Sequence, residues 1–374
     1  MAQPHDPDTP EPTFAELIAG RPHLAMHAMD GLIIEDVPLN AIADAIGTPV
    51  WVYSASAMRR RYRLLSGALA DSGLDAHVHY AMKANDRLAV LRLFGREGAG
   101  ADIVSEGELR RAREAGIAPE RIVFSGVGKS ERELRLALQE DIAQINVESA
   151  EELAMLSAIA DSMGRTARAV LRVNPDVDAG THAKITTGRA QDKFGIPAAE
   201  IVPLYRHAAS LPGICPIGLA THIGSQILTL APYRAVCARL AELVRTLRAE
   251  GLPVGVIDCG GGLGIPYRDE AAPLPEALAG ALRGALHNLD VRILVEPGRW
   301  LVGPAGVLLA SVILAKHTPG GRFVVLDAAM NDLVRPSLYD AWHEIAAVAP
   351  RGGEMIADVV GPVCESGDVF AVAR

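Results

Sequence analysis

The chain has 374 residues and a formal net charge of -9 at neutral pH. This length allows one large domain or two ordinary ones, including an α/β barrel of about 250 residues with a smaller partner domain. The acidic balance disfavours a nucleic-acid partner, because the only dense basic run is "RRRYR" at 59–63, which reads as one helix face. Small molecules or a second copy of the chain are the expected partners.

The four cysteines indicate a reducing compartment. They lie far apart, form no CxxC pair and follow no secretory leader, so neither a zinc site nor a disulfide framework is predicted. Residues 1–20 are acidic and proline-rich and are predicted to be a disordered leader. Apolar runs such as 305–315 are too short to span a bilayer. We therefore expect a cytoplasmic protein without a membrane segment or a bound metal.

From residue 78 onward, short β-branched runs alternate with amphipathic stretches, a pattern typical of parallel βα units. The predicted strands are "VHYAMKA" (78–84), "ADIVS" (101–105), "RIVFSG" (121–126), "AQINVES" (143–149), "AVLRVNP" (169–175), "GLATHIGS" (218–225), "GVIDCGGG" (255–262) and "RILVEPGR" (292–299). Eight such strands favour a closed (β/α)8 barrel over residues 51–299, although an open doubly wound sheet fits the same pattern.

The strand-to-helix junctions carry capping signals. Three of them read Ser-x-x-Glu, a pattern that predicts reciprocal capping boxes, and an asparagine can cap the first helix; these residues are Ser105 with Glu108, Ser130 with Glu133, Ser149 with Glu152, and Asn85. The flanks 21–50 and 300–374 lack the βα alternation and are β-rich. We expect them to form one smaller β domain.

Candidate catalytic groups follow the predicted strands. Lys83 ends the first, His222 and Ser225 the sixth, Gly260, Gly261 and Gly262 the seventh, and Glu296 and Arg299 the eighth. Each has an ordinary structural alternative: a snorkelling lysine, a core histidine, a glycine turn or an internal ion pair. Together they offer an amine, a ring-stacking imidazole, a phosphate nest of free backbone N–H groups and a carboxylate for a ring nitrogen. Pyridoxal phosphate needs this combination.

The chain resembles the bacterial diaminopimelate decarboxylases, pyridoxal-phosphate enzymes of the alanine-racemase fold type, from about residue 22 to its end. The motifs that carry the resemblance are, in order, "YAMKAN", "GADIVSEGEL", "RIVFSGVGKS", "INVESAEEL", "THIGSQI", "DCGGGLG", "EPGRWLV", "LDAAMNDLVRPSLY" and "VVGPVCESGD". The resemblance implies removal of CO2 from meso-diaminopimelate to give L-lysine in a homodimer.

The resemblance also implies residue roles in the cofactor site. Lys83 would bond to pyridoxal phosphate, His222 would lie on the ring face, and Glu296 would keep the ring nitrogen protonated. Ser225 and the glycines would hold the phosphate. The remaining matched positions of the cofactor pocket are Asp102, Arg172, Gly298 and Arg299.

For the substrate, Arg299, Arg335 and Tyr339 match residues that grip the distal carboxylate, and Glu365 matches the acidic group for the distal amine. A bidentate arginine suits that carboxylate, which ornithine and lysine lack. Cys364 would donate a proton at the reacting carbon of the neighbouring subunit's site.

One departure concerns the end of the chain. The family usually continues past "VCESGD" to a tyrosine-rich segment, and this sequence ends at Arg374. The expectation is an incomplete β domain that binds the cofactor yet turns over slowly. Alternatives are a decarboxylase of another basic amino acid or of carboxynorspermidine, and a catalytically silent relative. A racemase is disfavoured, because racemases place an arginine where this chain has Glu296.

Overall fold

The computed structural model describes residues 20–177, 188, 192–349 and 355–374. The chain forms two compact units. The barrel unit comprises residues 59–265 and 271–303. The β unit comprises the described residues up to 58, together with 266–270 and 304–374.

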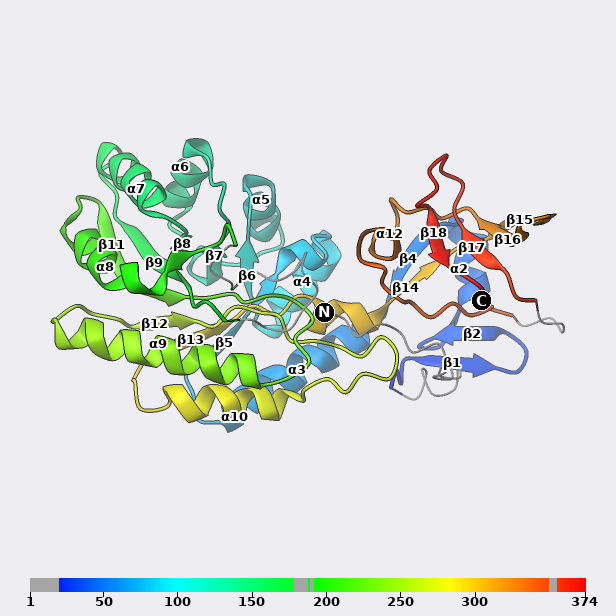
Figure 1. Cartoon of the computed structure of the whole chain (residues 1–374), viewed down its shortest axis with the longest axis horizontal. Helices are drawn as coiled ribbons and strands as arrows, with labels where there is room; N and C mark the ends of the chain where they lie inside the picture. Colours follow the sequence, from blue (N-terminus) through cyan, green and yellow to red (C-terminus); the bar gives the residue numbers. More distant parts are fainter. Residues whose placement is uncertain (1–19, 178–187, 189–191, 350–354) are drawn as a thin grey trace. The chain divides into compact units, whose positions relative to one another are not determined.

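The barrel unit is built on a closed ring of eight parallel strands (Figure 1). Their hydrogen-bonded order is β9-β11-β12-β13-β5-β6-β7-β8, and β8 pairs back with β9 to close the ring. The strands are β5 (Ala76–Ala81), β6 (Gly100–Ile103), β7 (Ile122–Phe124), β8 (Gln144–Val147), β9 (Ala167–Asn174), β11 (Ile214–Ala220), β12 (Val256–Asp258) and β13 (Arg292–Val295), with the short β10 (Ile196–Pro197) added to β9. The predicted barrel is confirmed, and the open sheet is excluded.

Helices cover the outside of the ring because each has one apolar face to bury. In α4, for example, Val90, Leu91, Leu93 and Phe94 are buried. The helices are α3 (Ala55–Asp71), α4 (Leu88–Glu97), α5 (Glu106–Glu114), α6 (Glu131–Glu140), α7 (Ala150–Ser162), α8 (Ile201–Ser210), α9 (Ala231–Ala249), α10 (Pro275–Leu286) and α11 (Arg299–Val302), with single turns η1 (Met82–Ala84), η2 (Pro119–Arg121) and η3 (Ala198–Glu200). None of the helices in the described part of the chain has the length and apolar composition that crossing a bilayer requires.

Three of the predicted caps form, but only one is reciprocal. Ser105, Ser130 and Ser149 each cap a helix by accepting a backbone N–H three residues later. Only Glu133 returns the bond to its cap residue. At the other two caps the glutamate reaches one residue further back, Glu108 to the N–H of Val104 and Glu152 to the N–H of Glu148. These glutamates therefore pin the end of the preceding strand.

The prediction that Asn85 caps the first helix is wrong. Helix α4 begins three residues later, at Leu88, and its N-cap residue Arg87 makes no side-chain cap bond. The Asn85 side chain instead accepts the N–H of Arg87 in a local turn (3.1 Å). This turn lies between the residue Lys83 and the helix.

The β unit joins both flanks of the chain, as predicted. Its β4 (Val50–Tyr53) pairs antiparallel with β14 (Gly306–Leu309). The other elements are β1 (Leu24–His27), β2 (Gly31–Ile34), β3 (Val37–Pro38), α2 (Leu39–Ile46), η4 (Gly303–Ala305), β15 (Val312–Thr318), β16 (Gly321–Leu326), α12 (Arg335–Tyr339), β17 (Asp358–Val360) and β18 (Val369–Ala371). Two small apolar clusters hold it, one around Leu24, Leu39 and Leu309 and one around Val359 and Phe370.

Candidate active site

Lys83 occupies the turn η1 that follows barrel strand β5. Its Nζ lies 3.7 Å from Oδ2 of Asp102, which comes from the neighbouring strand β6. The Lys83 side chain is 52% exposed, whereas the Asp102 side chain is fully buried. Neither oxygen of Asp102 has a hydrogen-bond partner among the described residues. The exposed amine therefore stands beside a buried carboxyl group, where a ligand can reach it.

Two further carboxyl groups join Asp102 in the barrel interior. Asp258 ends strand β12 and Glu296 follows strand β13, and both are at most 5% exposed. Burial raises the pKa of Asp258 to about 6. Burial, together with Asp102 and Asp258, raises the pKa of Glu296 well above its usual value. In the described part of the chain no group of three or more His, Cys, Asp or Glu side chains is arranged to hold a metal ion.

His222 is half-buried beside the glycine turn. Its Nδ1 accepts the N–H of Gly261 (3.1 Å). Burial holds the pKa of His222 well below its usual value, and the positive charges of Lys83 and Arg172 lower it further. A neutral imidazole fixed in this way can pack on an aromatic ring, but it does not carry a charge at neutral pH.

The three glycines after β12 are required by close backbone packing. A Cβ on Gly260 would lie 2.3 Å from the carbonyl oxygen of Thr221, and one on Gly261 would lie 2.1 Å from that of Glu296. The prediction that this turn exposes three free N–H groups is wrong. The N–H of Gly260 bonds to Asp258 Oδ1, and that of Gly261 bonds to His222. Two of the three donors are thus used to orient site residues.

The turn that follows β13 brings Arg299 to the same end of the barrel. Arg299 donates from Nη2 to Oγ of Ser225 (3.1 Å), which joins the loops after β13 and β11. Gly298 lets this turn approach the residues around Lys83, since a Cβ there would lie 3.1 Å from the Cβ of Ala84. The N–H of Ala81 donates to the carbonyl of Pro297 (3.2 Å). The predicted cofactor residues from β5, β11 and β13 are therefore tied together by short contacts.

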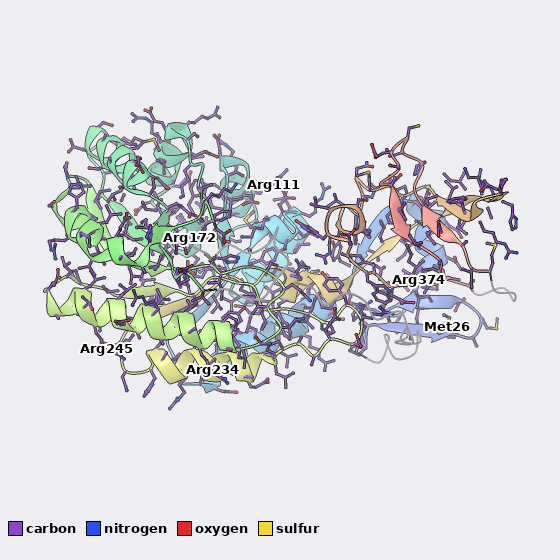
Figure 2. The ribbon with its side chains drawn as sticks, viewed as in Figure 1. Met26, Arg111, Arg172, Arg234, Arg245 and Arg374 are labelled. Carbon is purple, nitrogen blue, oxygen red and sulfur yellow. The ribbon has the colours of Figure 1, made fainter. Side chains whose placement is uncertain are left out.

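Arg172, labelled in Figure 2, is held by a partner that the sequence analysis did not single out. Its Nη1 lies 2.5 Å from Oε1 of Glu148, which is itself buried at the end of β8. Glu148 also accepts the N–H groups of Gly126 and Gly195. The position of Glu148 in the sequence could have indicated its role, because it is an acid at the carboxyl end of a predicted apolar strand. Asp258 occupies the same kind of position on another predicted strand.

The other predicted residues belong to the β unit. Arg335 begins helix α12; its guanidinium lies 4.6 Å from the ring centre of Tyr267 and 5.8 Å from that of Tyr339. Its Nε donates to Nε2 of His343 (3.3 Å). Cys364 and Glu365 are exposed in the turn between β17 and β18. That turn is braced by the buried Asp368, whose carboxylate accepts the N–H groups of Val363 and Met330.

The barrel residues fit the cofactor proposed for them. Glu296 Oε1 and both Asp102 oxygens are buried polar atoms without a hydrogen-bond partner among the described residues, as expected of groups that complete their bonding with a ligand. An exposed lysine amine, a neutral histidine and a glycine turn too tight for side chains complete the set. These are the contacts that a phosphorylated pyridine aldehyde requires.

Comparison with known proteins agrees with this reading. Residues 55–303 match the family described as pyridoxal-dependent decarboxylase, pyridoxal binding domain. Diaminopimelate decarboxylase of Zymomonas mobilis is 50% identical over 346 residues, which are 92% of this chain and 82% of that protein.

Solved structures give the same result. The crystal structure of diaminopimelate decarboxylase from Helicobacter pylori, complexed with L-lysine, aligns with a TM-score of 0.87 at 39% identity, over 90% of this chain and 84% of that one. The structure of diaminopimelate decarboxylase from M. jannaschii aligns with a TM-score of 0.89 at 32% identity, over 95% and 85% of the two chains. With its closed barrel and its lysine, histidine and acid groups gathered at one end, the chain belongs to the pyridoxal-dependent decarboxylases and, within them, to the diaminopimelate decarboxylase family.

Proposed function

We propose that the chain removes CO2 from meso-diaminopimelate to give L-lysine, with pyridoxal phosphate as its cofactor. The observation that carries the proposal is the grouping of Lys83, His222 and Glu296 at the C-terminal end of the barrel, in a chain half identical to a diaminopimelate decarboxylase. In barrels of this kind the active site lies at that end. The bound cofactor supplies an electron-withdrawing ring that takes up the charge left when CO2 departs.

In this proposal the barrel residues bind and orient the cofactor. The Lys83 amine forms the covalent bond, and Asp102, 3.7 Å away, holds that amine in place. His222 packs on the ring face in its neutral form. Glu296 would accept the N–H of the protonated ring nitrogen through Oε1, a buried atom that has no hydrogen-bond partner among the described residues. Ser225, the Gly260 to Gly262 turn, Gly298 and Arg299 form the phosphate side, while Arg172 is held by Glu148.

The β unit supplies the groups proposed to recognise the substrate. Arg335, half-buried and packed on Tyr267 and Tyr339, offers a planar fork to the distal carboxylate. Glu365 is proposed for the distal ammonium. The presence of both charges favours a substrate with a carboxylate and an amine at its far end over lysine or ornithine, which present only the amine.

We also propose a homodimer in which Cys364 serves the partner's site. What supports this is the exposure of Cys364 and Glu365 on a turn that Asp368 holds rigidly, as expected of residues displayed to another chain. Mixing inactive Lys83→Ala and Cys364→Ala subunits tests it. A two-fold dimer assembled at random from equal amounts should recover about a quarter of wild-type activity, because half of the dimers then contain one intact site. Exchange of subunits without recovery would place Cys364 in its own chain's site or outside catalysis.

The experiment that tests the function is CO2 release from a small panel of amino acids by the chain supplied with pyridoxal phosphate. The panel comprises meso-diaminopimelate, L-lysine, L-ornithine and carboxynorspermidine. Release from meso-diaminopimelate alone, with L-lysine as product, supports the proposal. Preference for lysine or ornithine would contradict the carboxylate role of Arg335. Cofactor binding without turnover of any member would identify a catalytically silent relative.

A further inference from the structure

We infer that Asp258 is a positioning residue that acts through Glu296: it fixes the Glu296 carboxyl where the ring nitrogen of the cofactor binds, and its other contacts hold the first glycine of the phosphate turn. This inference rests on the proposed function, since it concerns the same cofactor site. It adds a residue whose side chain links the two ends of that site.

The geometry of Asp258 leaves its carboxyl with little freedom. Oδ1 accepts the N–H of Gly260, and Oδ2 accepts Nδ2 of Asn146, each at 3.0 Å. Asp258 is also hydrogen-bonded to the Glu296 side chain. A main-chain hydrogen bond connects the same two segments, because the N–H of Glu296 donates to the carbonyl of Gly260 (2.8 Å). Two strands of the barrel, β12 and β13, are thus joined at the site by both side chain and main chain.

The direction of the Asp258–Glu296 bond follows from the neighbours of Asp258. Asn146 is itself oriented, because its Oδ1 accepts Nε2 of Gln144 (2.8 Å) and its Nδ2 also reaches Oγ of Ser125 (3.1 Å). Its amide therefore presents a donor to Asp258. Since both Asp258 oxygens already face donors, Asp258 is the ionised acceptor and Glu296 carries the proton between them.

The surrounding charges agree with this assignment. Burial and the negative charges of Asp102 and Asp258 raise the pKa of Glu296, and the hydrogen bond to Asp258 raises it further. Burial raises the pKa of Asp258, and the same hydrogen bond lowers it. The other charged group that acts on Glu296 is Lys83, which lowers its pKa. The second oxygen of Glu296, Oε1, has no hydrogen-bond partner among the described residues. Oε1 is therefore the atom of the Glu296 carboxyl that is left for the ligand.

The first test needs no cofactor. Infrared spectroscopy of the cofactor-free chain at pH 7.5 should show the carbonyl stretch of a buried protonated carboxyl, and the band should shift in protein labelled with 13C-glutamate. Asp258→Asn should remove the band, because its amide donates to an ionised Glu296. Glu296→Gln should remove it as well. A band that persists unchanged in Asp258→Asn would overturn the inference.

The second test separates the ring from the phosphate. Asp258→Asn keeps an oxygen for the N–H of Gly260, so the phosphate turn should survive. The Kd for pyridoxal phosphate should fall about 10-fold, because an ionised Glu296 makes a charge-assisted hydrogen bond to the protonated ring nitrogen where the protonated Glu296 of the wild type makes a neutral one. The Kd for the 1-deaza analogue, in which carbon replaces the ring nitrogen, should not change. In a Glu296→Gln background the substitution should have no additional effect on either Kd. Asp161→Asn, on the exposed end of α7, is the matched control and should resemble wild type.

Two outcomes would contradict the second step. If Asp258→Asn weakens the binding of pyridoxal phosphate and of the 1-deaza analogue equally, Asp258 supports only the turn or the fold. If the substitution changes neither Kd, Asp258 does not act on Glu296. If Asp258→Asn does not fold, Asn146→Ala replaces it. Removing that donor should move the proton from Glu296 to Asp258, so that the infrared band shifts with 13C-aspartate instead of 13C-glutamate. Failure of the wild-type chain to bind pyridoxal phosphate would count against the proposed function and leave the infrared test of Asp258 standing.

Discussion

The barrel unit and the β unit present their proposed functional residues in opposite ways. In the barrel, Asp102, Asp258 and Glu296 are buried and lie at the ends of hydrogen-bonded strands. In the β unit, Cys364 and Glu365 are exposed, and all seven residues of β15 are exposed as well. The barrel residues therefore belong to the folded core and to the site together, whereas those of the β unit are displayed on a surface. Substitutions should separate the two cases. Those of the barrel residues should affect folding or cofactor binding, and those of the β-unit residues should affect substrate binding alone.

The largest effect is expected at Lys83. Lys83→Ala should fold and retain no covalently bound cofactor, because the amine that forms the bond is absent, and CO2 release should fall to background. Borohydride reduction of wild type followed by peptide mapping should place the cofactor on Lys83. Lys193→Ala, which removes another exposed lysine of the barrel unit, is the control and should be labelled and active. A label on Lys193 would contradict the assignment of the site to the end of β5.

A second prediction compares the contributions that a buried lysine of the barrel unit and an exposed lysine of the β unit make to stability. The Lys129 side chain is 1% exposed and its Nζ bonds to Glu152 and to the carbonyls of Gly126 and Asn146. Lys129→Met leaves Glu152 as an unpaired buried charge, so the free energy of unfolding should fall by about 3–5 kcal/mol in urea titrations. Lys316→Met, on exposed β15, should change it by less than about 0.5 kcal/mol. Similar losses for both would remove the distinction between the units.

The barrel was predictable from sequence because its pattern repeats. Short apolar strands alternate with helices, and three of these helices begin at a serine cap, as in "INVESAEEL", where Ser149 caps α7 and the buried strand β8 precedes it. The β unit has no such repeat. Its strand β4 pairs with β14, more than 250 residues later, so no local pattern could indicate the partner.

The site was predictable at its strand ends and less so in its contacts. Lys83, His222 and Glu296 stand where the strands were expected to end, so their shared location followed from the barrel. The hydrogen-bond partners within the site could not be predicted from the sequence in the same way. Which acceptors take the N–H groups of Gly260 and Gly261 depends on side chains from distant strands, Asp258 and His222. Glu148 and Arg172 likewise meet only because β8 and β9 are neighbours in the closed ring.

The free energy of unfolding should depend on pH through a residue of the barrel unit rather than of the β unit. His79 on β5 is buried, and burial, with the positive charges of His77, Arg121 and Arg292, lowers its pKa to about 4. The unfolded chain takes up a proton near pH 6.5 and the folded chain does not, so this histidine destabilises the fold as pH falls from 6.5 to 4. The free energy of unfolding of His79→Leu, taken relative to that of wild type, should therefore be about 2.5 kcal/mol higher at pH 4.5 than at pH 7. Urea titrations at both pH values measure the change, and a constant difference between the two proteins would contradict it.

The smallest effect in free energy is expected at Arg335, and it sharpens the comparison most. Arg335 is half-buried between Tyr267, Tyr339 and His343, and it is proposed to meet only the distal carboxylate of the substrate. Arg335→Ala should raise KM for meso-diaminopimelate by about 10- to 30-fold, because a partly solvated charged hydrogen bond contributes near the lower end of 1.5–3 kcal/mol. The Kd for pyridoxal phosphate and the free energy of unfolding should stay near wild type, unlike the results for Lys83 and Lys129. Arg322→Ala, an exposed arginine on β16 of the same unit, should leave KM unchanged. Loss of cofactor affinity in Arg335→Ala would mean that the β unit takes part in holding the cofactor, and the division of labour between the two units would have to be redrawn.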